Sequence, residues 1–224
     1  PLRPVTAAAD VEKGQAQWGA KGWQPMECLA GTLDGAGHTI SGLYYSRAGE
    51  DRLGLFSNLE GATVKDLAIT TPNKQLLGRD YVGLLAGYGN YNTFTNVQLT
   101  LGGSIRGNSQ VGALGGLLRY SQFTGCRVTG GTVSGRDHLG GLVGKALAAV
   151  LRDCQAAADV KRFGGEVGKD FDSYGGLVGR ANWNSTIESC GASGNVTGWD
   201  HTGGLVGRFS GTLRNSHASG NVLG

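Results

Sequence analysis

The chain has 224 residues, 42 of them glycine, and a formal net charge of +3. So small a charge gives no support for binding nucleic acid or an anionic membrane surface, and no apolar run is long enough for membrane insertion. Proline occurs only four times and glycine has no strict three-residue period, which excludes collagen. The ordered apolar fraction of 39% argues against disorder and indicates short strands joined by tight turns.

Residues 1–22 are expected to form an N-terminal cap. Positions 5–18 can form a short amphipathic helix that covers the first strands, since uncapped strands invite aggregation. The first residues contain no signal-peptide core, so we expect a mature or excised segment, with the rest of a larger parent protein beyond the C-terminus.

A Gly-Leu-x-small tetrad then recurs along the chain. Its first glycines are 29, 29, 29, 35 and 28 residues apart: Gly54, Gly83, Gly112, Gly141, Gly176 and Gly204. We attribute the one long interval to a surface insertion at residues 162–169. A regular period of this length predicts a repeat architecture.

Apolar residues alternate with polar ones after each tetrad. One column of apolar or small residues contains Leu67, Val97, Cys126, Cys154 and Cys190, and a later one contains Ile105, Val133, Val196 and Val222. A period of two is typical of strands with one buried face, whereas helical repeats need a period of 3.6. The sequence therefore predicts an all-β fold: a right-handed, three-sided parallel β-helix over residues 23–224, as a single domain.

The repeats resemble the GLUG motif, whose name describes glycine-leucine-apolar-glycine. The clearest copies are Gly141-Leu142-Val143-Gly144, Gly176-Leu177-Val178-Gly179 and Gly204-Leu205-Val206-Gly207, and residues 31–43 look like the usual lead-in. This resemblance implies a repeat region of bacterial surface or secreted proteins, such as adhesins and IgA-specific metallopeptidases. A His-Glu-x-x-His zinc motif is absent from the sequence, so peptidase activity is not carried over.

A polar column is predicted four residues before each tetrad. It contains Glu50, Arg79, Asn108, Asp137, Asp172 and Asp200, of which the last three would stack as a weak candidate for a calcium site; no other metal or cofactor is expected. Lys145, Arg180 and Arg208 follow the later tetrads, so the alternative is two solvated ladders of opposite charge. A pair of carboxylates acting in glycosidic acid–base chemistry is a further alternative.

Aromatic residues and thiols complete the candidate sites. Aromatic residues in the turns after the tetrads either stack on sugars, grip a protein partner, or pack within the turns: Tyr88, Tyr91, Tyr120, Trp183 and Phe209. Trp199 lies beside Asp200 and His201. Cys126, Cys154 and Cys190 are expected to be buried, as reduced thiols or with one disulfide.

Together these features predict a non-catalytic, extracellular repeat module of a bacterial adhesin. It would act as a rigid stalk, as a surface that binds a glycan or a protein, or as both. The candidate binding residues are Tyr91, Tyr120, Trp183, Trp199, Asp172, Asp200 and His201. The alternative is a polysaccharide lyase or hydrolase, because such enzymes also use parallel β-helices.

Overall fold

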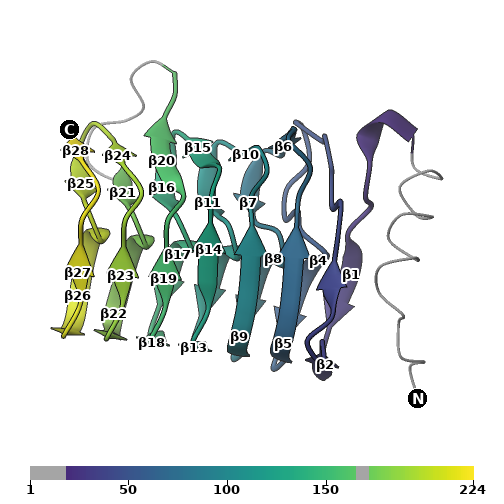
Figure 1. Ribbon diagram of the computed structural model, residues 1–224, viewed down its shortest axis with the longest axis horizontal. Helices are drawn as coiled ribbons and strands as arrows, with labels where there is room; N and C mark the ends of the chain where they lie inside the picture. The colour runs from purple at the N-terminus through teal and green to yellow at the C-terminus, as the bar shows by residue number, and fades with distance from the viewer. Residues whose placement is uncertain (1–18, 165–171) are drawn as a thin grey trace.

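The computed structural model describes residues 19–164 and 172–224, which form the predicted right-handed parallel β-helix. Its windings stand side by side along one axis (Figure 1). One residue from each of seven windings lies in a single paired row: Met26, Phe56, Ala86, Gly115, Val143, Val178 and Val206. Successive members are 28 to 30 residues apart, except for 35 between Val143 and Val178.

Two predicted segments fall wholly or mainly outside the described residues. They are the helix at positions 5–18 and, within the insertion, residues 165–169. The described part begins with the 3-10 turn η1 (Gly19–Lys21). Trp23 is buried just after this turn, and its indole N–H donates a hydrogen bond of 3.1 Å to the carbonyl oxygen of Leu55.

The windings build three sheets, and all pairings between their strands are parallel. The largest sheet bends around the axis of the β-helix and consists of three consecutive rows of strands. Its first row comprises β1 (Met26–Leu29), β4 (Phe56–Glu60), β8 (Ala86–Asn90), β12 (Gly115–Arg119), β17 (Val143–Leu147), β22 (Val178–Glu188) and β26 (Val206–Arg214). The second row comprises β2 (Thr32–Asp34), β5 (Thr63–Thr70), β9 (Thr93–Thr100) and β13 (Gln122–Thr124), then β18 (Val150–Arg152) and the ends of β22 and β26.

The remaining strands complete each winding. The third row comprises β3 (Thr39–Ile40), the ends of β5 and β9, β14 (Arg127–Thr129), β19 (Gln155–Ala156), β23 (Gly191–Ala192) and β27 (His217–Ala218). A six-stranded sheet comprises β6 (Gln75–Leu77), β10 (Ser104–Arg106), β15 (Thr132–Gly135), β20 (Asp159–Arg162), β24 (Val196–Thr197) and β28 (Val222–Leu223). A five-stranded sheet comprises β7 (Asp80–Val82), β11 (Ser109–Gly112), β16 (Asp137–Gly140), β21 (Ser173–Gly175) and β25 (His201–Gly203).

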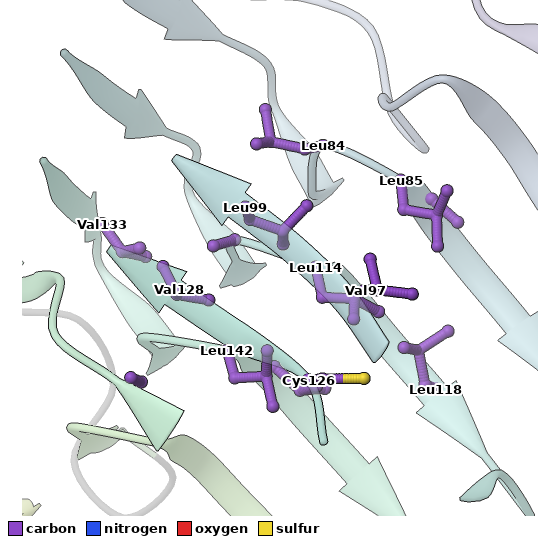
Figure 2. Packing of buried hydrophobic residues seen from close by; sticks show 14 of the residues in the cluster. Leu84, Leu85, Val97, Leu99, Leu114, Leu118, Cys126, Val128, Val133 and Leu142 are labelled. Carbon is purple, nitrogen blue, oxygen red and sulfur yellow. The ribbon is translucent and has the colours of Figure 1, made fainter. Parts of the chain in front are cut away.

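Apolar columns fill the interior between the sheets (Figure 2). The predicted column of Leu67, Val97, Cys126, Cys154 and Cys190 is buried throughout. The three cysteines in it are free thiols, and the backbone N–H of Cys154 lies 3.4 Å from the sulfur of Cys190. Burial of each large apolar side chain contributes about 1.5–3 kcal/mol, so the continuous column is a main source of stability.

Close approach between windings explains the glycines of the tetrads. Among the described tetrads, none of these glycines has a positive φ. A Cβ atom on Gly112 would instead lie 2.5 Å from the amide nitrogen of Gly144 in the next winding. Gly179 faces the other way, and its Cβ atom would lie 2.7 Å from the nitrogen of Leu139. Close packing between windings, and not a positive φ, is therefore what requires glycine at these positions.

Between the third and fourth tetrads, the windings align one residue away from the predicted tetrad alignment. Gly112 pairs with Gly140, not with Gly141, and Gly140 pairs with Gly175. The later tetrads are preceded by a second glycine, and this extra glycine continues the column. A shift of one residue exchanges the faces of a strand, so it changes which polar side chains are neighbours.

Candidate functional site

The corrected register assembles an aspartate ladder along the start of the five-stranded sheet. Its members are Asp51, Asp80, Asp137, Asp172 and Asp200, with Ser109 between Asp80 and Asp137. Glu50, Arg79 and Asn108, which were predicted to share this column, lie one residue earlier in their windings. That part of the prediction was wrong. The sequence alignment matched the single glycine of the early tetrads to the second glycine of the later pairs, whereas the structure matches it to the first.

Carboxylates of this ladder accept hydrogen bonds from side chains of neighbouring windings. Asp51 accepts two from the guanidinium of Arg79, at 2.7 and 2.6 Å. The hydroxyl of Ser109 donates to Asp137 at 3.0 Å. The Arg79 contact lowers the pKa of Asp51. The ladder is thus tied into the winding structure from one layer to the next.

Asp172 differs from Asp51 in its surroundings. Its side chain is buried and accepts a hydrogen bond of 3.2 Å from the hydroxyl of Tyr174. Burial, followed by the charge of Asp137, raises the pKa of Asp172. Within residues 19–164 and 172–224, His, Cys, Asp and Glu form no group of three or more that could hold a metal ion.

Two Asp-His pairs lie on the ladder. The Nδ1 atom of His201 lies 3.1 Å from a carboxylate oxygen of Asp200, and both side chains are partly exposed. His138 contacts Asp137 in the same way but is buried, and its Nε2 atom lies 3.4 Å from Nη1 of Arg180. The second pair therefore connects the ladder to the sheet that follows the tetrads.

Three exposed aromatic rings form a ridge at the corner after the first row of the large sheet. The rings of Tyr91 and Tyr120 stack with centroids 4.9 Å apart and an interplanar angle of 10°. Trp183 lies two windings beyond Tyr120, with Ala148 at the equivalent position of the intervening winding, and its ring centroid lies 6.3 Å from that of Tyr120 at an angle of 38°. The side chains of this aromatic ridge (Tyr91, Tyr120 and Trp183) are 63%, 45% and 55% exposed.

The backbone at this corner is unusual for bulky residues. Tyr91, Tyr120 and Trp183 all have positive φ, of 56°, 49° and 57°. A side chain in this region costs roughly 1–2 kcal/mol, and glycine or asparagine is the usual occupant. No sequence pattern indicated this conformation, although the three rings were predicted at equivalent turns after the tetrads.

The other predicted aromatic residues do not join the ridge. Tyr88 lies between two guanidinium groups, those of Arg52 and Arg119, at 5.1 and 5.4 Å, and Phe209 packs against the core. Trp199 is 60% exposed but lies at a different corner, where the guanidinium of Arg162 covers its ring at 4.6 Å. The predicted binding residues therefore form two groups, the ridge and the neighbourhood of the aspartate ladder.

A basic strip runs beside the ridge. Lys145 pairs with Arg180, and Arg180 with Arg208, so the three cations lie on successive windings. This column was predicted from the sequence, but only as a ladder of positive charges that offsets the charge of the acidic ladder. Among the described residues, no ion pair of 4.0 Å or less joins it to the aspartate ladder.

Comparison with known proteins finds a partial similarity. A stretch of 164 residues, 69% of the chain, is 36% identical to Halomucin of Haloquadratum walsbyi. The chain spans 1% of the length of that relative. No family model matches, so the GLUG resemblance stays a prediction. No helix in the described residues is long and apolar enough to cross a membrane.

Proposed function

We propose that this chain is a non-catalytic, GLUG-type repeat module of a surface or secreted adhesin. The observation that carries the proposal is the continuous parallel pairing of seven windings, because it builds an elongated support with a different surface on each side. Solenoids of this kind present extended binding surfaces. The similarity to a segment of Halomucin is consistent with a location at the cell surface or outside the cell.

The module acts as a rigid spacer and presents the aromatic ridge to a glycan or a protein partner. Aromatic side chains supply large apolar area together with polar edges, which suits both kinds of ligand. The carboxylates support a structural role rather than a catalytic one. Asp51 and Asp137 accept hydrogen bonds from neighbouring windings, and Asp172 is buried beside Tyr174.

Immunolabelling of intact source cells tests the location. Antibodies raised against the chain should label intact cells or the medium around them. A signal that requires permeabilised cells would contradict the proposal.

Incubation with a panel of polysaccharides tests the non-catalytic assignment. We expect no new reducing ends and no unsaturated products. Product formation that disappears in Asp172→Asn, with binding preserved, would instead establish the polysaccharide lyase or hydrolase alternative.

A further inference from the structure

The basic strip is a line of like charges on one face of the large sheet. Lys145, Arg180 and Arg208 occupy equivalent positions in β17, β22 and β26, about 5 Å apart as parallel strands require. Their neighbour Ala181 points inward and is fully buried, so the three cations point outward. They are half-buried in the surface.

The protein itself compensates these charges poorly. In the part of the chain that the structure describes, none of the three forms an ion pair with a carboxylate. Burial and then the charge of Arg180 lower the pKa of Lys145, and burial and then Arg208 lower that of Arg180. Asp137 acts in the opposite direction on both, but it already accepts a hydrogen bond from Ser109. A bound anion would relieve the repulsion.

The aromatic ridge follows the same direction as the strip. Trp183 lies three residues after Arg180 in β22, at the corner where the first row of the large sheet passes into the second. Tyr120 stands in the same relation to Leu117, which pairs with Lys145. Both features therefore run along the solenoid axis, with one outward column between them. The cations lie on the windings of β17, β22 and β26 and the rings on those of β8, β12 and β22, so a linear polymer that crosses obliquely from the strip to the ridge would meet both.

Anionic polysaccharides match this combination of groups. Carboxylates and sulfates accept charge-assisted hydrogen bonds from Lys and Arg, while the C–H faces of the sugar rings pack on aromatic side chains. Single-stranded nucleic acid also combines charge with stacking. However, Tyr91 and Tyr120 stack on one another at 4.9 Å, which leaves no space for a base between them.

We propose that the basic strip and the aromatic ridge together bind an anionic polysaccharide that carries carboxylate or sulfate groups on successive sugars. The choice of a polysaccharide over other polyanions rests on the proposed extracellular function. The remaining steps rest on the geometry of Lys145, Arg180, Arg208 and the ridge alone.

Calorimetric titration of the 224-residue chain tests this proposal. The probes are heparin as a sulfated polymer, polygalacturonate as a carboxylated one, dextran as a neutral one, and a single-stranded oligothymidylate. At least one of the two anionic polysaccharides should bind, more weakly as sodium chloride is added. Dextran should give no signal, and the oligothymidylate should bind at least tenfold more weakly than the better polysaccharide.

Matched variants separate the site from general charge effects. The double variant Arg180→Gln/Arg208→Gln should lose about tenfold or more in affinity, and Trp183→Ala should weaken binding several-fold. Arg127→Gln is the control, because Arg127 is exposed on another side in β14. Circular dichroism melting confirms that each variant is folded.

Four results would overturn the proposal. They are no binding to either polyanion, equal binding of dextran, tighter binding of the oligothymidylate, and an equal loss in Arg127→Gln. Measuring the polymer length after the titration distinguishes a failure of the proposed non-catalytic function from a failure of the proposed ligand. A shortened polymer refutes the non-catalytic function while binding stands, whereas an intact polymer without binding refutes only the ligand.

Discussion

Gly144 packs against Val111 of the preceding winding, so closely that a Cβ atom on Gly144 would lie 2.5 Å from the Val111 amide nitrogen. The contact is with backbone atoms, which cannot move aside without opening the parallel pairing between windings. It explains why a glycine ends the tetrad.

Gly144→Ala should therefore destabilise the protein by about 1–3 kcal/mol, the range for overpacking in a close-packed interior. Urea unfolding measures the change. Gly49→Ala is the matched control, since a Cβ atom there meets nothing within 4 Å, and it should be nearly neutral. Equal effects of both substitutions would show that the close approach is not what requires Gly144.

The three stacked thiols should be inert in the folded protein. A hydrogen bond with Cys126 raises the pKa of Cys154, and one with Cys154 raises that of Cys190. The bond with Cys154 lowers the pKa of Cys126, but all three thiols are fully buried and out of reach of a reagent. Reactive thiols are exposed thiolates. A thiol reagent should label only Cys28 in the native state, and all four cysteines after denaturation. Fewer than four reactive thiols after denaturation without reductant would indicate a disulfide.

Asp172→Asn should stabilise the protein at neutral pH. The pKa of Asp172 is raised above its usual value of 3.8, so the folded state holds its proton more strongly than the unfolded state. This stabilising effect is complete below pH 3.8 and is lost as the pH rises through the folded pKa. The amide has no such proton to lose, so Asp172→Asn should be more stable than the parent protein at pH 7.

Asp51→Asn is the control of opposite sign. Arg79 lowers the pKa of Asp51, so this carboxylate stabilises the fold above its usual pKa and ceases to do so as the pH falls. Unfolding titrations between pH 3 and pH 7 should show a flatter profile for Asp172→Asn and a loss at pH 7 for Asp51→Asn. Destabilisation by both variants at pH 7 would refute the assigned environment of Asp172.

The stacked rings of Tyr91 and Tyr120 should be energetically coupled. A double-mutant cycle with Tyr91→Ala and Tyr120→Ala should give a coupling free energy of about 0.5–1.5 kcal/mol. Tyr91 paired with Trp199 is the control, since Trp199 lies at another corner, and its coupling should be close to zero. A coupling near zero for Tyr91 and Tyr120 would mean that the two rings do not rest on one another in solution.

Much of the fold was predictable because the repeat period and the alternation of apolar residues are explicit in the sequence. The column of Cys126, Cys154 and Cys190 was predicted correctly for this reason. The position of Arg79 relative to the aspartate ladder was not predicted correctly. A single glycine can align with either member of a glycine pair, and the two alignments differ by one residue. Only the pairing of Gly112 with Gly140 decides between them.

The candidate site was predictable in its residues but not in its geometry. Tyr91, Tyr120 and Trp183 were visible as aromatic residues in equivalent turns. Their positive φ was not, since large side chains rarely adopt it. The basic strip could be predicted as well. Its lack of ion pairs with the aspartate ladder could not, because it depends on distances from Arg180 to the ladder, and a sequence does not contain distances.

The vertical registry of the windings is the claim on which the rest depends, and a spin-label distance tests it most directly. Thr95 and Arg214 share one outward column through Thr124, Arg152 and Glu188, so they are four windings apart. With Cys28 replaced by serine, labels at Thr95→Cys and Arg214→Cys should give one narrow distance distribution near about 20 Å, from about 5 Å per winding. A broad distribution, or one centred well beyond that distance, would contradict the stacked β-helix.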